Sequence, residues 1–185
     1  SREKSRALIM AGQVHIHGVR VEKPGILVPL DSHLEVKERN RYVSRGGVKL
    51  QHALEEFCID VRGMNALDVG ASTGGFTDCL IQHGVEKVYA LDAGYGQLDY
   101  QLRKDPRIVS MERHNAHLPF TLAEIVGIAT IDVSFISLTK VMPQVQRNLK
   151  PRSPVIALVK PQFEAGRAEV GKGGVVRDPQ VHATV

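Results

Sequence analysis

The sequence predicts an α/β protein with a mostly parallel sheet, preceded by a small α+β module. A glycine-rich turn follows an apolar strand at Leu67–Phe76, strands alternate with helices through the rest of the chain, and the surplus of positive charge is confined to the first quarter. Strand–helix alternation is typical of parallel sheets, whose strands are joined by right-handed helical crossovers. We expect the module at residues 1–37, a linker at 38–47 and the α/β domain at 48–185.

The uneven charge suggests a polyanionic partner. The 185 residues carry 24 Lys and Arg against 20 Asp and Glu, and residues 1–50 alone hold 10 basic against 5 acidic residues. Contacts to phosphates supply most of the non-specific affinity of proteins for nucleic acids. We therefore expect RNA or DNA to bind this first part, and a solvated basic surface is the alternative.

Composition narrows the class of protein. With 43% hydrophobic and 24% charged residues, the chain has the composition of a globular protein. Its apolar runs are shorter than the roughly 18 residues that a membrane span needs, and its first residues lack the apolar core of a secretory signal. Cys58 and Cys79 are spaced for neither a metal site nor a disulfide framework. We expect a cytoplasmic protein with reduced thiols, no metal site and no membrane association.

The first part reads as a helix followed by a hairpin. Ser1–Met10 has helical composition, and Gly12 is placed as its C-terminal cap. Val14–Val21 alternates between apolar and polar residues, with His17-Gly18 in the position of a hairpin turn. A short closing strand is expected at His33–Lys37. About 37 residues is little for an independent core.

The second part begins with a helix from Val48, whose apolar residues recur at helical spacing. Asp178-Pro179 is typical of a helix start, with an N-cap followed by a proline in the first turn. Between them, five strands are expected at Ala66–Val69, Lys87–Asp92, Ile108–Met111, Ile128–Val133 and Val155–Val159.

Two kinds of cofactor fit the glycine-rich turn. A dinucleotide fingerprint that starts at Gly70 needs glycine at position 72, where Ser72 stands, although Gly75 matches the pattern. The alternative is S-adenosylmethionine, with Asp68 toward its cationic amino-acid end and Asp92 toward the ribose hydroxyls. A tight turn without a ligand is the third possibility. Two acids at strand ends favour S-adenosylmethionine.

The segment after the third strand is placed beside the adenine of such a cofactor. There Asn115 has an amide that can bind a ring nitrogen or an amine, and a polar turn is the alternative. The expected cofactor contacts are Asp68, Gly70, Ala71, Ser72, Gly74, Gly75, Phe76, Asp92, Asn115 and Asp132.

Three charged residues stand where charge is costly. Lys49 borders the apolar stripe of its helix and follows Ser44–Gly47, which we expect to be flexible. Asp132 and Lys160 each end an apolar strand. Strand tips of an open α/β sheet face the ligand crevice, so these two side chains are expected to converge beside the cofactor. Strand-end charges that merely reach solvent are the alternative.

The motifs resemble a known family. Ser1–Gly25 resembles the second half of the S-four RNA-binding fold. SRGGVKL, LDVGASTGGFTDCL, IDVSFISL and LVKPQFEAGR occur in that order and resemble the TlyA-type ribosomal RNA 2′-O-methyltransferases, many of which are labelled haemolysins. The resemblance implies a Rossmann-like S-adenosylmethionine-dependent, FtsJ-like methyltransferase domain whose last strands lie beyond Val185. It also implies an S-four-like module that has lost its first helix.

The resemblance also implies a Lys-Asp-Lys-Glu tetrad, matched here by Lys49, Asp132 and Lys160, with the Glu expected beyond Val185. A ribose hydroxyl is a poor nucleophile, so its proton must leave as the methyl group transfers. A lysine accepts that proton only when its own pKa is depressed, by burial or by a second ammonium. We expect Lys160 to be the base, Lys49 its partner, and Asp132 the group that orients it.

Ribosomal RNA or ribosomal subunits are the implied partners. The glycine-containing segment 161–179 is expected to be a flexible basic loop that closes over RNA, or simply a mobile connection. Two other functions stay open: a catalytically inactive RNA-binding protein, and a cytolysin. The expected RNA contacts are Arg2, Lys4, Arg6, Arg20, Arg45, Arg167 and Lys172.

Overall fold

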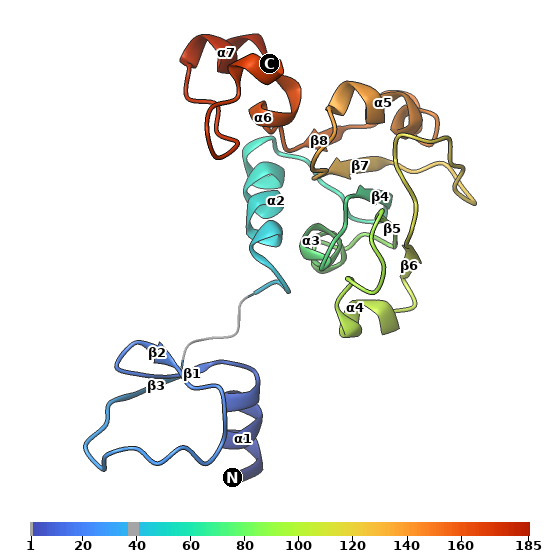
Figure 1. The fold of residues 1–185 in the computed structure, drawn as a ribbon. Helices are drawn as coiled ribbons and strands as arrows, with labels where there is room; N and C mark the ends of the chain where they lie inside the picture. Colours follow the sequence, from blue (N-terminus) through green and yellow to red (C-terminus); the bar gives the residue numbers. More distant parts are fainter. Residues whose placement is uncertain (1, 37–40) are drawn as a thin grey trace. The chain divides into compact units, whose positions relative to one another are not determined.

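The structure is a computed structural model that describes residues 2–36 and 41–185 (Figure 1). The side chain of Lys4 lies outside the described part. The chain divides into two compact units, Ser1–Arg41 and Tyr42–Val185. Residues 38–40 of the predicted linker fall outside the described residues, and residues 42–47 belong to the second unit.

The first unit contains the predicted helix, hairpin and closing strand. The hairpin turn uses His17 and Gly18, both with positive φ (48° and 79°), as a two-residue turn between twisted strands requires. β1 pairs antiparallel with both neighbours, in the order β2-β1-β3. The elements are α1 (Arg2–Met10), β1 (Val14–Ile16), β2 (Val19–Arg20) and β3 (Leu34–Val36).

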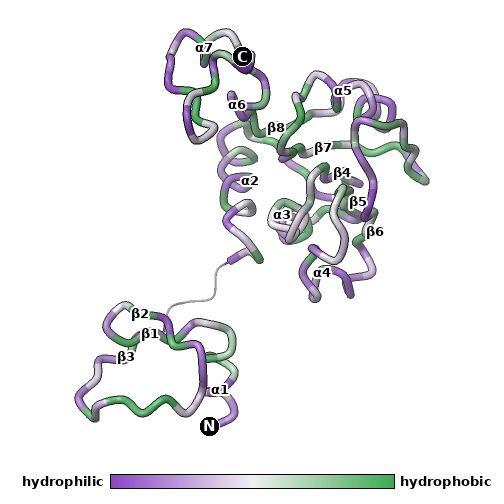
Figure 2. Tube along the Cα trace, in the orientation of Figure 1, coloured by the Kyte–Doolittle hydropathy of each residue, from purple (hydrophilic) through white to green (hydrophobic). Residues whose placement is uncertain are grey.

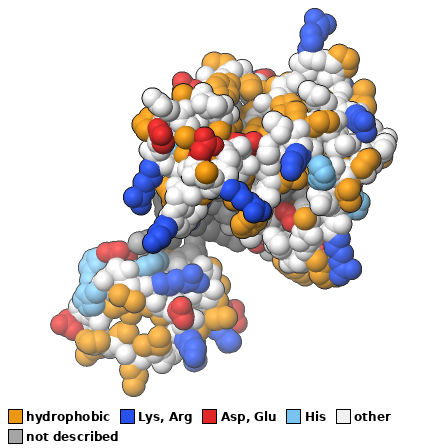
Figure 3. Space-filling model, turned by 45° about the horizontal axis from the view of Figure 1, so that its top comes forward, with side chains coloured by type: hydrophobic (Ala, Val, Ile, Leu, Met, Phe, Trp, Pro, Cys, Tyr) orange, Lys and Arg blue, Asp and Glu red, His pale blue; other side chains and the backbone are white. Residues whose placement is uncertain are grey.

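This unit has a small core. Among its described residues, Val21 is the only buried hydrophobic side chain, whereas Leu27 and Leu30 are 98% and 109% exposed. Figure 3 shows hydrophobic side chains on the surface of this unit, with histidine side chains gathered over one part of it. The shallow core agrees with the small number of residues available to build it.

The second unit contains a five-stranded sheet in the order β6-β5-β4-β7-β8, with every neighbouring pair parallel. The predicted parallel α/β fold is confirmed. β5, β7 and β8 end one or two residues earlier than predicted. The strands are β4 (Asn65–Val69), β5 (Lys87–Leu91), β6 (Ile108–Met111), β7 (Ile128–Ile131) and β8 (Val155–Ala157).

Helices cover both faces of this sheet. α2, α3 and α4 contribute to the hydrophobic cluster on one face, and α5 packs in the cluster on the other. The tube in Figure 2 is hydrophobic along β7 and mostly hydrophilic along α4. The helices are α2 (Arg45–Glu56), α3 (Gly75–Gln82), α4 (Tyr100–Lys104), α5 (Leu138–Gln146), α6 (Pro161–Glu164) and α7 (Pro179–Thr184), with a 3₁₀ turn at Arg167–Glu169.

α2 begins at Arg45, three residues before the predicted start. Ser44 is its N-cap, and the Ser44 side chain accepts a hydrogen bond from the Gly46 N–H. The segment that was expected to be flexible is therefore the cap and first turn of a helix. A Cβ on Gly47 would overlap the buried ring of Tyr42, so glycine is required at this position.

The order of strands determines where a ligand can bind. From the central β4 the chain adds β5 and β6 on one side, and then returns to add β7 and β8 on the other. Such a switch point opens a crevice outside the carboxyl ends of the strands, here between β4 and β7.

Candidate active site

Two cavities of about 530 Å³ each lie at the carboxyl ends of the strands. They share a wall made by Gly70, Ser72, Asp132 and Ser134. The first cavity also borders the start of α2, and the second extends toward the end of β5. A ligand in one cavity therefore adjoins a ligand in the other.

The first cavity brings together the three charged residues predicted from the sequence. Lys49 comes from α2, Asp132 directly follows β7, and Lys160 precedes α6. The Lys160 Nζ lies 2.6 Å from the Asp132 Oδ1 and donates a hydrogen bond of 2.8 Å to the Ser134 Oγ. The side chains of Lys160 and Asp132 are only 21% and 25% exposed. Their ion pair is therefore shielded from bulk water, in which such pairs contribute little.

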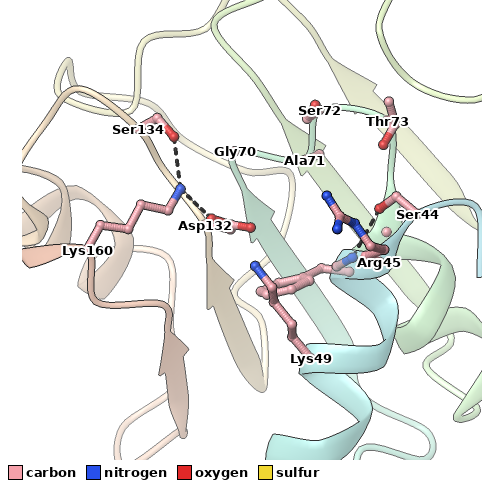
Figure 4. Close-up of a pocket in the computed structure, with 13 residues that line it drawn as sticks. Ser44, Arg45, Lys49, Gly70, Ala71, Ser72, Thr73, Asp132, Ser134 and Lys160 are labelled. Atoms are coloured by element: carbon pink, nitrogen blue, oxygen red, sulfur yellow. Dashed lines mark hydrogen bonds and ion pairs between the residues drawn. The ribbon is translucent and has the colours of Figure 1, made fainter. Parts of the chain in front are cut away.

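Lys49 approaches the same cavity from the other side. Figure 4 shows the amines of Lys49 and Lys160 reaching in from different elements, with the Asp132 carboxylate between them. Arg45 and Ser44 form the adjoining rim at the start of α2. The cavity thus combines three cationic side chains with a carboxylate and several hydroxyl groups, a set that suits a polar, partly anionic ligand.

The glycine-rich turn forms the shared wall. Gly70 has a φ of +83°, and a Cβ there would lie 2.6 Å from the carbonyl oxygen of Asp132. Only glycine permits this approach of two backbones. Ala71, Ser72, Gly75 and Phe76 line the first cavity as well.

Gly74 lies away from both cavities. Its missing Cβ leaves room for Leu98 and Leu102, which would collide with any larger residue. Gly75 has a second role, since a Cβ there would overlap the Ser44 side chain and crowd the start of α2. The sequence assigned both glycines to the cofactor, whereas the geometry assigns Gly74 to the packing of α3 against α4.

The second cavity contains the other predicted cofactor residues, Asp92 and Asn115. The Asp92 carboxylate accepts hydrogen bonds from the Ser72 N–H (2.7 Å) and the Gly94 N–H (2.6 Å), one on each oxygen. Each oxygen keeps a lone pair for a further donor. The Asn115 Oδ1 accepts a hydrogen bond from the His117 N–H (3.0 Å), so the amide NH2 of Asn115 remains available. Apolar walls come from Leu91, Ile136 and Val141.

Asp68, which the sequence predicts as a direct cofactor contact, lines neither cavity. It is 1% exposed and accepts hydrogen bonds from the hydroxyls of Thr77 (2.6 Å) and Thr130 (2.9 Å). Burial raises the pKa of Asp68 to about 6, although these hydrogen bonds oppose the shift. Asp68 therefore ties β4 to α3 and β7 beneath the cavities.

The predicted RNA contacts lie in three places. Arg45 borders the first cavity. Arg167 and Lys172 are exposed on the segment after Lys160, which is partly ordered by α6, the 3₁₀ turn and a bridge between Gly171 and Val175. Their role in binding RNA stays a prediction, as it does for the exposed Arg2, Arg6 and Arg20 of the first unit, and for Lys4.

Several residues of the site were missed from the sequence. Ser134 binds Lys160, and Thr73, Gln97 and Phe135 line the cavities. Ser134 lies two residues beyond the predicted Asp132, so its position at the strand tip was an available signal. The other three occupy turns whose course the sequence pattern does not reveal.

Other predictions concern the described part of the chain as a whole. In residues 2–36 and 41–185 no group of three or more His, Cys, Asp or Glu is arranged to hold a metal ion. Within the same residues, no helix is both long and apolar enough to cross a membrane. Cys58 is exposed and Cys79 is buried, and in the described part of the chain neither is joined in a disulfide.

Comparisons with known proteins agree with this arrangement. The profile of the FtsJ-like methyltransferase family matches residues 42–185. The 16S/23S rRNA (cytidine-2′-O)-methyltransferase TlyA of Mycobacterium tuberculosis is 46% identical over 187 residues, covering 99% of this chain and 70% of that protein. Hemolysin A of Brachyspira hyodysenteriae is 46% identical over 181 residues, covering 96% and 75%.

A solved structure shows the same fold. A hemolysin-labelled protein of Streptococcus thermophilus superimposes with a TM-score of 0.78 at 44% identity, covering 100% of this chain and 69% of that one. The family profile, the two relatives and this solved structure all point to the same family for the second unit. The chain belongs to the FtsJ-like methyltransferases and is related to the TlyA and hemolysin A proteins.

Proposed function

We propose that the protein transfers a methyl group from S-adenosylmethionine to a ribose 2′-hydroxyl of ribosomal RNA. The observation that carries the proposal is the convergence of Lys49, Asp132 and Lys160 in a cavity that shares a wall with the cavity around Asp92. The names of the relatives support it, because the TlyA proteins of Mycobacterium tuberculosis and Campylobacter jejuni are rRNA (cytidine-2′-O)-methyltransferases.

The second cavity fits the methyl donor, which when bound supplies an electrophilic methyl group on a sulfonium. The free lone pairs of Asp92 can accept hydrogen bonds from the two hydroxyls of a ribose, and the amide NH2 of Asn115 can donate one to an adenine nitrogen. Leu91 and Val141 supply the apolar surface on which an aromatic base packs. The residues present therefore fit an adenosine group.

The residues of the first cavity suit activation of a ribose hydroxyl. Lys160 is the proposed base: once it has lost the extra proton that it carries in the ion pair with Asp132, its Nζ takes the proton from the hydroxyl, so that a negative oxygen does not have to accumulate in a partly buried site. Asp132 and Ser134 orient the Nζ of Lys160 through contacts of 2.6 Å and 2.8 Å. Lys49, on the opposite side, holds the hydroxyl or the neighbouring phosphate.

The surroundings of the first cavity suit an RNA strand. Arg45 on the rim provides a cation for a phosphate, and Arg167 and Lys172 are exposed on the segment that follows Lys160. Ribosomal subunits or their RNA are therefore the proposed partners. The basic residues of the first unit are proposed to add non-specific affinity for the same RNA.

The test supplies tritiated S-adenosylmethionine and the purified protein to small subunits, large subunits and naked rRNA. We expect tritium in the RNA of at least one substrate, and we expect the labelled linkage to resist alkaline hydrolysis, which needs a free 2′-hydroxyl. Label in a base, or no label in any RNA, would refute the proposed function. The matched control is Lys140→Ala, which removes an exposed lysine of α5 that lines neither cavity.

A further inference from the structure

The segment that follows Lys160 is short and needs outside support. α6 has only four residues, Pro161–Glu164, and Lys160 is its N-cap. A single helical turn is not stable by itself, because too few hydrogen bonds offset the ordering of its backbone. The backbone of Lys160 therefore depends on what holds the far end of this turn.

Glu164 holds the far end. Its Oε1 accepts a hydrogen bond from the Leu138 N–H (2.8 Å), and its Oε2 accepts one from the Ser137 hydroxyl (2.6 Å). Ser137 and Leu138 are the N-cap and the first residue of α5. The Leu138 N–H has no partner inside its helix, and the negative charge of a carboxylate at this end interacts favourably with the helix dipole. Glu164 is thus a cap of α5 supplied by a distant segment.

Glu164 and Lys160 bind the same loop, the connection between β7 and α5. Asp132 and Ser134, the two partners of the Lys160 amine, lie just before Ser137 in the same connection between β7 and α5. Between the two attachments, the rings of Phe135 and Phe163 pack with their centroids 5.1 Å apart. The β7–α5 connection and the segment Lys160–Glu164 are therefore joined at two points. Lys160 makes one attachment and Glu164 makes the other.

We propose that Glu164 is a positioning residue, which holds Lys160 in register with Asp132 by tying α6 to the start of α5. The inference rests on the proposed function, because it gives Glu164 its role through the base Lys160. Proton transfer needs the two heavy atoms at hydrogen-bond distance, and displacements of about 1 Å in an active site cost up to about 100-fold in rate. Loss of the Glu164 attachment is expected to permit such a displacement.

The test compares Glu164→Ala with Glu164→Gln in the full chain, using single-turnover methyl transfer to rRNA with saturating S-adenosylmethionine. We expect Glu164→Ala to lower the rate by about 10- to 100-fold. Its dissociation constant for S-adenosylmethionine should stay within about threefold of the wild type, because the polar groups of the second cavity are untouched. Glu164→Gln should recover most of the rate, since its side-chain carbonyl can still accept a hydrogen bond from the Leu138 N–H and its amide NH2 can donate one to the Ser137 hydroxyl.

The matched control is Glu169→Ala. Glu169 lies in the same segment, and its carboxylate accepts from the Gly166 N–H, away from both cavities. This variant should keep the wild-type rate within about twofold. Hydrogen exchange supplies a readout besides activity, since the Leu138 amide should lose protection in Glu164→Ala and keep it in the control.

The possible outcomes separate the two proposals. An active wild type with an equally active Glu164→Ala variant would overturn the inference and leave the proposed function standing. A parallel loss of rate, cofactor affinity and thermal stability, without rescue by glutamine, would also overturn it, because the role of Glu164 would then be general folding. A wild type that methylates no RNA would refute the proposed function, and the inference would fall with it.

Discussion

Each end of the parallel sheet carries a lysine–carboxylate pair, and in both pairs the charged atoms are 2.6 Å apart. At the amino ends of β4 and β5, Lys87 binds Glu124. At the carboxyl ends, Lys160 binds Asp132. The side chains of the first pair are 41% and 36% exposed, and those of the second are 21% and 25% exposed.

The two pairs differ in how completely their carboxylates are used. Glu124 also accepts from the Tyr89 hydroxyl (2.9 Å) and the Asn65 amide (2.6 Å), and its pKa is lowered chiefly by the hydrogen bond from Lys87. Neither Lys87 nor Glu124 borders a cavity described above, whereas Asp132 borders both. An ion pair alone therefore does not identify a site. The adjoining space, and the other cations around it, distinguish the carboxyl end.

Removing the two lysines should separate these roles most strongly. Lys160→Ala should lower the rate of methyl transfer by about 100- to 10,000-fold, because the proton acceptor is lost. Lys87→Ala should leave the rate within about twofold and slightly lower the melting temperature, as expected for an exposed pair. Single-turnover assays and thermal unfolding of both variants provide the measurement. Similar losses of rate in the two variants would contradict the distinction between the two ends.

A second change tests the backbone on which the carboxyl-end pair rests. Gly70→Ala would place a Cβ against the carbonyl of Asp132 and impose a positive φ on alanine, which costs about 1–2 kcal/mol in strain alone. We expect urea unfolding to show at least this loss, and methyl transfer to fall by about tenfold or more as Asp132 is displaced.

The control for this change is Gly96→Ala. Gly96 has a similar positive φ (68°), but open space surrounds the position of its Cβ. The control should show the strain without the loss of activity. If Gly70→Ala and Gly96→Ala lose equal stability and both remain fully active, then the close approach of Gly70 to Asp132 has no functional role.

The third and smallest expected effect concerns Asp68, a carboxylate that belongs to neither pair. Its pKa is about 6 in the folded protein against an ordinary value of 3.8, so folding favours the protonated form. The resulting stabilisation is fully present below about pH 3.8 and is lost as the pH rises through about 6. Relative to Asp68→Asn, the wild type should therefore gain about 1 kcal/mol between about pH 8 and about pH 5.

Urea unfolding of the wild type and of Asp68→Asn at both pH values measures this difference. Parallel pH dependences in the two proteins would show that the buried carboxyl is not the group responsible. In that case Asp68 would no longer stand apart from the two ion pairs as a buried carboxyl with a raised pKa.

Much of the fold was predictable because its signals are local. The apolar runs of β4 and β7, the cap at Asp178 and the hairpin turn at His17-Gly18 each depend on neighbours in the sequence. The charged residues at strand tips were predictable for a related reason. In a parallel sheet the carboxyl ends of the strands meet at one edge, so the topology alone brings Asp132 and Lys160 together.

Asp68 shows what this reasoning does not capture. Its position near a strand end suggested a ligand contact, but side chains alternate along a strand, and Asp68 shares its face with Ala66, which packs in the cluster that contains α3. Its carboxyl therefore lies under α3, beside Thr77. Gly74 is a similar case, because the approach of α4 accounts for it.

The sequence by itself determined the α/β class, the glycine-rich turn, the charged strand tips and the capped helices, since each of these depends on residues close together in the chain. Only the tertiary structure decided that Lys160 binds Asp132 and Ser134, that Glu164 caps α5, and that Asp68 is turned away from the cavities. The physical reason is that side-chain pairings between distant segments depend on packing distances of a few tenths of an ångström, which no local pattern encodes.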